Sequence, residues 1–226
     1  MNSGKPAGAP PTKILIVDDH PMMREGLAQL IGNQPDLTVC GEAGNAHEAL
    51  EKVRLLKPDL VLVDITLPGR NGLELIKDIQ VLDAAISVLV ISMHDESLYA
   101  ERVLRAGGRG YVMKQEGGKK IMEAIRQVSA GQIFVSEKMS AKILEIFSGH
   151  RPDAGQSPVE NLTDREFEVF QLIGQGMETK QLARELHVSP KTIEVHRANI
   201  KAKLKIKSMA ELIRYAVRWV ESEKPD

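Results

Sequence analysis

The chain has 226 residues, of which 42% are hydrophobic and 27% charged, and its formal net charge at pH 7 is −1. These values are typical of a globular protein with two domains, and they exclude a uniformly basic coat for nucleic acid or membranes. The single cysteine, Cys40, leaves no internal disulfide to form. No run of about 18 apolar residues is present, so we expect a cytoplasmic protein without membrane contact.

The N-terminal half alternates short apolar segments with segments of helical periodicity. Residues 1–11 are rich in Gly, Pro and Ala and lack an apolar signal-peptide core, so we expect a disordered tail. The predicted strands are 14–17, 37–41, 60–63, 88–91 and 110–113, and the predicted helices are 21–34, 46–57, 72–83, 98–106 and 119–130. Continuous apolar strands are typical of a parallel sheet covered on both faces. The fold class predicted for residues 12–131 is therefore α/β, with a flavodoxin-like, doubly wound, five-stranded parallel sheet.

The C-terminal half has only helical patterns. A short helix at 137–147 and a Gly- and Pro-rich linker at 148–161 are predicted to form a connecting region at 132–161. Residues 162–222 then predict an all-α domain with four helices at 163–174, 178–187, 190–205 and 208–222. This half has an excess of positive charge, because residues 161–221 carry 11 Lys and Arg against 8 Asp and Glu, a net charge of +3.

Polar side chains follow the predicted strands where each strand ends. Strand one is followed by Asp18 and Asp19, strand three by Asp64, strand four by Ser92 and strand five by Lys114. With the strand order 2-1-3-4-5, strands one and three are neighbours, so the three carboxylates converge on one pocket.

Three clustered carboxylates repel one another unless a cation lies among them, and Mg²⁺ is the usual hard cation beside a phosphate. With Mg²⁺ bound, one carboxylate can act as a nucleophile toward a phosphoryl group. Lys114 would then neutralise the phosphoryl oxygens, and the Ser92 hydroxyl would donate to them.

The four segments KILIVDDHP, LVLVDITLPGRNGLEL, VLVISMH and GYVMK occur in this order. With them, residues 13–130 resemble the receiver domain of a two-component response regulator. The resemblance implies that Asp64 is the phosphoacceptor and that Asp19 and Asp64 bind Mg²⁺, with Asp18 assisting through water. It also implies the backbone carbonyl of Thr66 as a third protein ligand, and Ser92 with Tyr111 as a switch pair that moves on phosphorylation.

The second and third predicted helices of the C-terminal half are joined by a tight turn. Ser189 is a good N-cap and Pro190 a good first helical residue. The helix that follows carries a basic face, and two helices joined in this way are typical of a helix-turn-helix. The predicted DNA-binding residues are Lys191, Thr192, Glu194, Val195, Arg197, Ala198 and Lys201.

Residues 162–220 resemble the LuxR-type DNA-binding domain of the NarL/FixJ family, through the segment LTDREFEVFQLIGQGMETKQLARELHVSPKTIEVHRANIKAKL. The resemblance implies that the third helix enters the major groove. Lys191, Arg197 and Lys201 are expected to reach phosphates, whereas Glu194 and Val195 are expected to meet base edges.

The leading hypothesis is a DNA-binding transcriptional regulator controlled by phosphorylation, and not an enzyme. Its expected partners are a sensor histidine kinase, double-stranded promoter DNA, RNA polymerase and, on phosphorylation, a second copy of the chain. We also expect the unphosphorylated receiver to dock on the C-terminal half and mask the third helix. Two alternatives stay open: an aspartyl-phosphate phosphohydrolase, although that class has a second acid where this chain has Thr66, and a pseudo-receiver that only binds proteins.

Overall fold

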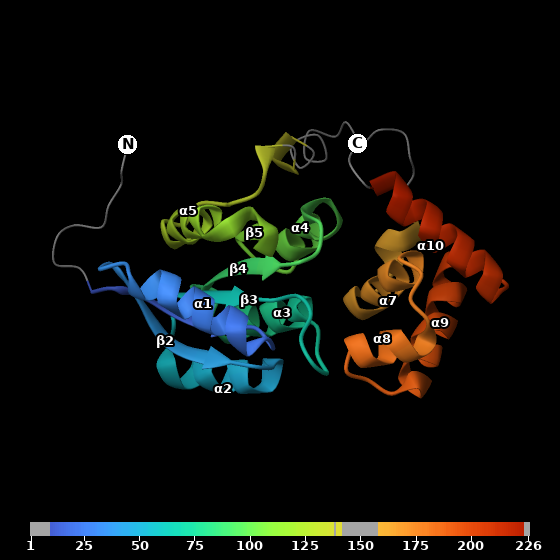
Figure 1. Ribbon diagram of the computed structural model, residues 1–226, viewed down its shortest axis with the longest axis horizontal. Helices are drawn as coiled ribbons and strands as arrows, with labels where there is room; N and C mark the ends of the chain where they lie inside the picture. The colour runs from blue at the N-terminus through green and yellow to red at the C-terminus, as the bar shows by residue number, and fades with distance from the viewer. Residues whose placement is uncertain (1–9, 138, 142–157, 224–226) are drawn as a thin grey trace.

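The computed structural model describes residues 10–137, 139–141 and 158–223. They form an N-terminal α/β domain and a C-terminal helical domain, which lie side by side in Figure 1 with α7 of the second domain facing the first. The predicted connecting helix at 137–147 is described only at 137 and 139–141, and most of the predicted linker lies outside the described residues.

The N-terminal domain contains one parallel sheet of five strands in the order β2-β1-β3-β4-β5, as the sequence predicts. Because β1 and β3 are neighbours, the residues that follow them lie at the same edge of the sheet. The strands are β1 (Thr12–Val17), β2 (Leu37–Ala43), β3 (Leu60–Val63), β4 (Ser87–Ser92) and β5 (Gly110–Met113).

Helices cover both faces of this sheet, which explains why β3, its central strand, is apolar and buried at every position. Side chains of α1 and α5 pack on one face, and side chains of α2, α3 and α4 pack on the other. The helices are α1 (Pro21–Gly32), α2 (Ala46–Leu56), α3 (Gly72–Leu82), α4 (Glu96–Arg105) and α5 (Gly117–Ser129), with a 3-10 turn, η1 (Lys114–Glu116), before α5.

Local polar groups determine where these helices begin. Asp95 accepts a hydrogen bond from the backbone N–H of Ser97, so α4 begins at Glu96, two residues before the predicted start. Asn71 caps α3 in the same way by accepting from the N–H of Leu73. Gly72 follows it, and a Cβ at this position would lie 2.2 Å from the carbonyl oxygen of Asp64, so only glycine fits there.

The C-terminal domain consists of a 3-10 turn, η2 (Pro158–Asn161), and the helices α7 (Asp164–Gly174), α8 (Thr179–Glu185), α9 (Pro190–Leu204) and α10 (Met209–Glu223). The four predicted helices are confirmed to within two residues at each end. The last four residues of the predicted linker are ordered instead as η2, because Val159 is buried and Leu162 after it is buried as well.

The two domains share apolar packing. The hydrophobic cluster on the α2, α3 and α4 face of the sheet continues into the core of the C-terminal domain. None of the described helices is long and apolar enough to cross a membrane.

Candidate functional site

The structure brings together the carboxylates and the lysine that the sequence places at the strand ends. Lys114 Nζ lies 2.6 Å from Asp64 Oδ2 and 2.7 Å from Asp18 Oδ2. Asp18 and Asp64 are 2% and 4% exposed, so this lysine is the cation that makes their burial tolerable. The parallel sheet produces the convergence, because each of these residues directly follows its strand and the strands β1, β3 and β5 end at the same edge of the sheet.

Burial raises the pKa of Asp64, and Asp18 adds to the shift, whereas Lys114 acts in the opposite direction. Burial alone would lower the pKa of Lys114, but the charges of Asp64 and Asp18 outweigh it, so its pKa is raised. The lysine therefore keeps its proton at neutral pH and holds a positive charge beside Asp64.

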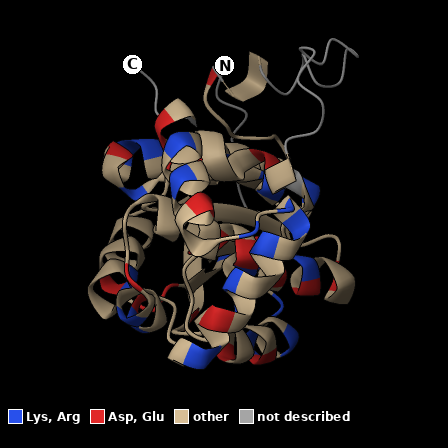
Figure 2. Ribbon diagram, turned by 90° about the vertical axis from the view of Figure 1, so that its right-hand side faces the viewer, with Lys and Arg blue, Asp and Glu red and all other residues tan. Residues whose placement is uncertain are grey.

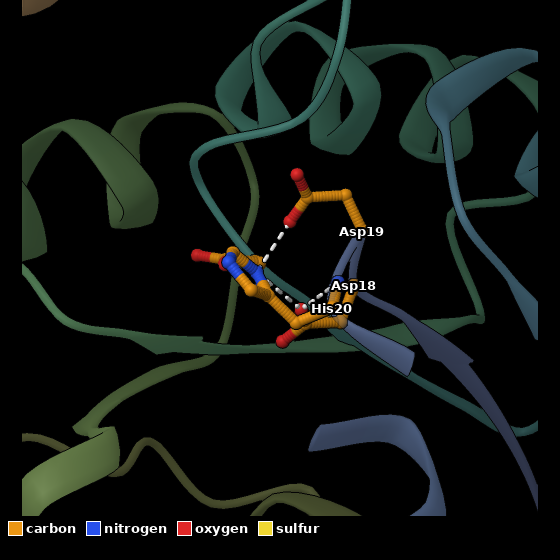
Figure 3. A group of neighbouring side chains, drawn as sticks. Asp18, Asp19 and His20 are labelled. Atoms are coloured by element: carbon orange, nitrogen blue, oxygen red, sulfur yellow. Dashed lines mark hydrogen bonds and ion pairs between the residues drawn. The ribbon is translucent and has the colours of Figure 1, made fainter. Parts of the chain in front are cut away.

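Asp19 lies beside this pair and faces His20, the residue that precedes α1. His20 Nδ1 is 2.7 Å from Asp19 Oδ1 and 3.4 Å from Asp18 Oδ1 (Figure 3). From the other domain, His187 Nε2 lies 3.6 Å from Asp19 Oδ2. His187 has a left-handed backbone conformation in the turn between α8 and α9, and only tertiary structure places it here.

The donor atoms fit a hard divalent cation. One ligand atom from each of Asp18, Asp19, His20 and Asp64 can be chosen so that all lie within 4.8 Å of one another. Asp19 Oδ1 is buried and accepts no hydrogen bond from the described residues, although the His20 ring lies close to it. A set of ligands rich in carboxylate oxygens suits Mg²⁺. The backbone carbonyl of Thr66, two residues after Asp64, stays a prediction as a ligand.

The predicted switch pair is buried behind the carboxylates. Ser92 and Tyr111 are 0% and 1% exposed. The backbone N–H of His94 donates to Ser92 Oγ at 3.3 Å, and the Tyr111 hydroxyl donates to the carbonyl of His94 at 2.8 Å. His94 therefore links the two residues, a role that sequence reasoning missed.

The His94 ring also contacts the loop that follows Asp64. Its Nε2 and Thr66 Oγ1 lie 3.0 Å apart in a hydrogen bond, and its ring centroid is 5.0 Å from that of Tyr99 on α4. Burial and the positive charge of Lys114 lower the pKa of His94 to about 4, so the ring is neutral at pH 7.

The C-terminal domain presents the predicted helix-turn-helix. The Ser189 hydroxyl accepts from the N–H of Thr192 at 3.1 Å and Pro190 is the first residue of α9, as predicted. Ile193 and Ile200 are buried in the domain core. Seen from the side of this domain, both basic and acidic residues lie on the helices that face the viewer (Figure 2).

Most of the predicted DNA-binding residues lie at the surface of α9. The Glu194 side chain is 60% exposed and Val195 is 53% exposed, while Lys191 and Ala198 are exposed and Thr192 and Lys201 half-buried. Arg197 differs from the expectation, because only 12% of its side chain is exposed. Its guanidinium Nη1 donates to Thr179 Oγ1 at the start of α8 and to Glu194 Oε1 at 3.1 Å.

The receiver-like domain docks on η2 and the start of α7. Arg102 of α4 donates to the carbonyls of Val159 and Leu162 at 3.0 and 3.1 Å, and its guanidinium carbon lies 3.9 Å from the centre of the Phe167 ring. Tyr99 packs on the same ring, with centroids 5.4 Å apart. Lys77 Nζ lies 2.7 Å from Asp164 Oδ2 at the edge of this contact.

At the same interface, the buried carboxylate of Glu168 accepts hydrogen bonds from both domains. Asn71 Nδ2 donates to Glu168 Oε2 at 2.8 Å, and Arg165 Nη1 donates to the same oxygen at 2.8 Å. Arg165 Nη2 continues to the carbonyl of Leu186 at the end of α8. Docking is thus as expected, but the expected masking of α9 is wrong for Glu194 and Val195, which stay exposed while the N-terminal domain contacts α7.

Comparison with known proteins agrees with this architecture. Residues 14–126 match the family described as "Response regulator receiver domain", and residues 160–216 match "Bacterial regulatory proteins, luxR family". The nitrate/nitrite response regulator protein NarL of Escherichia coli (strain K12) is 36% identical over 216 residues, which cover 95% of this chain and 97% of NarL. The chain belongs to the NarL/FixJ family of response regulators.

Other relatives extend the comparison. The oxygen regulatory protein NreC of Staphylococcus carnosus is 33% identical over 91% of this response regulator and 97% of NreC. A LuxR-family response regulator from Aurantimonas sp. SI85-9A1 is 36% identical, with a TM-score of 0.56 over 61% of this chain and 99% of that chain. RcsB of Salmonella enterica serovar Typhimurium, solved bound to promoter rprA, shares the fold with a TM-score of 0.61 at 23% identity, over 92% of this chain and 98% of RcsB.

The response regulator therefore combines a receiver domain with a LuxR-type DNA-binding domain. Its family consists of DNA-binding transcriptional regulators, which points away from the phosphohydrolase alternative.

Proposed function

We propose that this response regulator accepts a phosphoryl group on Asp64 from a sensor histidine kinase, and that phosphorylation controls dimerisation and binding to promoter DNA. The observation that carries the proposal is the pairing of buried Asp64 with Lys114 at 2.6 Å. A protonated lysine beside a buried carboxylate neutralises negative charge where phosphoryl oxygens would arrive.

The transfer step is a displacement at phosphorus. A carboxylate oxygen of Asp64 forms the new bond to phosphorus, and the bond to the donor breaks, with its electron pair leaving on the donor nitrogen or oxygen. Lys114 stays protonated, and its ammonium group pairs with an oxygen of the phosphoryl group on Asp64. Bound Mg²⁺, held by Asp19, Asp64 and the Thr66 carbonyl with Asp18 assisting through water, would neutralise the remaining charge.

The contacts of the phosphoacceptor loop suggest how the signal reaches the second domain. Asn71 lies on the loop that follows Asp64 and donates to Glu168 of α7. His94 bonds to Thr66 on the same loop, and its ring contacts Tyr99, which packs on Phe167. Movement of the Ser92 and Tyr111 pair would therefore shift both contacts and weaken docking.

Release of the docked domain would allow two copies to bind DNA together. In each copy α9 would lie in the major groove, with Lys191 and Lys201 at phosphates and Glu194 and Val195 at base edges. A symmetric dimer would read two half-sites about one helical turn apart. On α10, Ile213 is 42% exposed and offers apolar surface for a second copy.

Intact-mass measurement tests the phosphoacceptor directly. Incubation with acetyl phosphate and Mg²⁺ should add the mass of one phosphoryl group and release acetate, and Asp64→Asn should abolish the addition. Asp83→Asn, a change at an exposed aspartate, is the matched control and should still be modified. An adduct that persists in Asp64→Asn would place the modification elsewhere.

A further inference from the structure

Three side chains at the start of α8 and on the outer part of α9 form a closed ring of hydrogen bonds. The Thr179 hydroxyl donates to Glu194 Oε1 at 3.1 Å, and it accepts from Arg197 Nη1. The same Arg197 Nη1 donates to Glu194 Oε1 at 3.1 Å. A hydroxyl has one proton to donate and two lone pairs, so Thr179 can serve both neighbours at once.

The members of this ring differ in exposure. Glu194 is 60% exposed on the surface of α9, whereas Arg197 is 12% exposed and lies against the first turn of α8. Arg197 lines a cavity of about 490 Å³ together with Met177, Thr179 and Met209. Arg197 therefore hydrogen-bonds to Thr179 and Glu194 on the side of the ring that faces the domain. To reach a DNA phosphate, its side chain would have to break these hydrogen bonds.

The ring has two consequences for Glu194. A free glutamate on a helix surface samples several rotamers, and fixing one of them on binding costs conformational entropy. The ring fixes the Glu194 rotamer before DNA binds, so binding loses less entropy. Both hydrogen bonds also go to Oε1, which leaves Oε2 to accept from a partner outside the domain. The positive charge of Arg197 further reduces the repulsion between this carboxylate and DNA phosphates.

We propose that Thr179 and Arg197 are positioning residues that hold the Glu194 carboxylate for the amino group of a cytosine in the major groove. They would set sequence preference without contacting DNA themselves. The proposal rests on the proposed function, because it requires Glu194 to face base edges. Cytosine is the base expected here, because its N4 amino group is a major-groove donor that a carboxylate accepts.

The experiment is binding-site selection on randomised DNA with the full-length chain loaded with beryllofluoride, followed by affinity measurements over a range of salt concentrations. Thr179→Val removes the hydroxyl at nearly constant shape, and Thr179→Ser restores it. Arg197→Met removes the charge but keeps a long side chain in the cavity. Glu194→Ala removes the reader, and Lys201→Ala serves as the reference for a phosphate contact.

Glu194→Ala should lower the preference for cytosine at one position of each half-site by roughly tenfold, the scale of one base contact. Thr179→Val and Arg197→Met should lower the same preference by about threefold or more, with other positions and the salt slope unchanged. Thr179→Ser should restore it. In the Glu194→Ala background, Thr179→Val should have no further effect, because nothing is left to position.

The opposite results are equally distinct. Lys201→Ala should reduce the salt slope by about one unit and leave the motif unchanged. If Arg197→Met behaves like Lys201→Ala, then Arg197 is a phosphate contact and the proposal is wrong. If Glu194→Ala relaxes the motif but Thr179→Val does not, the positioning role fails while the reading role stands. If Glu194→Ala leaves the motif unchanged, the reading role in the proposed function fails as well.

Discussion

Asp64 and Glu168 are both buried carboxylates, but they are held in different ways. Asp64 is 4% exposed and is paired with Lys114 of its own domain. Glu168 is 0% exposed and is paired with Arg165 of its own domain and Asn71 of the other. Burial raises the pKa of each, and a basic partner opposes the shift. The first arrangement can persist through any domain movement, whereas the second loses a partner when the domains separate.

The comparison distinguishes a permanent charge pair from a conditional one. Asn71 can exchange Glu168 for water at little net cost, since a neutral hydrogen bond contributes only about 1 kcal/mol. Lys114 cannot be withdrawn from Asp18 and Asp64 without leaving two buried charges uncompensated. In the proposed function, the pocket would therefore stay intact while the two domains separate.

The largest effect is expected when the permanent pair is broken. Lys114→Met should lower the free energy of unfolding by about 3–5 kcal/mol at neutral pH, because Asp18 and Asp64 lose their cation. Urea unfolding in chelator measures this, and added Mg²⁺ should recover part of the loss. Lys120→Met is the matched control, since Lys120 is 43% exposed and pairs with Glu123 at the surface. Equal effects of the two changes would mean that Lys114 does not stabilise the pocket.

A smaller effect is expected at the interface between the domains. Arg102→Ala removes two hydrogen bonds to backbone carbonyls, an ion pair with Asp164 and the contact with the Phe167 ring. The docked state should lose about 2–4 kcal/mol, and the radius of gyration in solution scattering should increase. Phosphotransfer to Asp64 should persist.

Arg105→Ala on the same helix supplies the control for that change. Arg105 is 57% exposed and pairs with Glu101 within α4, so its loss should leave the scattering profile unchanged. The ring centroid of Trp219, the single tryptophan, lies 5.4 Å from that of Phe167, so its fluorescence gives a second signal. Its emission should shift in Arg102→Ala and not in Arg105→Ala. Unchanged scattering and emission in both variants would contradict the docked arrangement.

The smallest of these effects concerns His94, which contacts both regions. Its pKa is lowered to about 4 in the folded protein, against 6.5 for an ordinary histidine. A lowered histidine pKa means that the folded state is favoured while the ring is neutral, so stability falls as the pH drops from about 6.5 toward 4. The free energy of unfolding should be about 2 kcal/mol lower at pH 5 than at pH 7 from this residue alone.

His94→Gln should remove that part of the pH dependence, because glutamine keeps a hydrogen-bonding end without titrating. His47→Gln is the control, since the His47 side chain is 87% exposed. Unfolding curves at several pH values between 5 and 7 give the comparison. The same pH dependence in all three proteins would mean that His94 is not held neutral.

The sequence predicts the pocket around Asp64 because the parallel sheet places the residues that follow its strands side by side. Asp18, Asp64 and Lys114 lie far apart in the chain, yet a parallel sheet of known order must place them together. No comparable rule of topology predicts the contacts of Glu168 and Arg102, because these contacts join two domains. Glu168 appears in the sequence as one more acidic residue on an amphipathic helix, and only the relative position of two domains gives it Asn71.

The role of Arg197 was missed for a related reason. Its place in the helical repeat suggests the outer face of α9, but a long side chain can turn toward a neighbouring helix. Thr179, 18 residues earlier, is its partner, and no local pattern reports a contact between two helices. Helix and strand bounds were predictable to within a few residues because caps such as Ser189 and Asn71 act locally.

The central claim is that phosphorylation at Asp64 controls DNA binding by releasing the docked domain, and one titration tests it directly. Binding to a selected site is measured by fluorescence anisotropy for wild type, Asp64→Asn and Arg102→Ala, each with and without beryllofluoride. Wild type should gain about tenfold or more in affinity with beryllofluoride, the usual scale of coupling between two sites. Asp64→Asn should gain nothing, and Arg102→Ala should bind tightly without it. An equal gain in Asp64→Asn, or weak binding by undocked Arg102→Ala, would contradict the account.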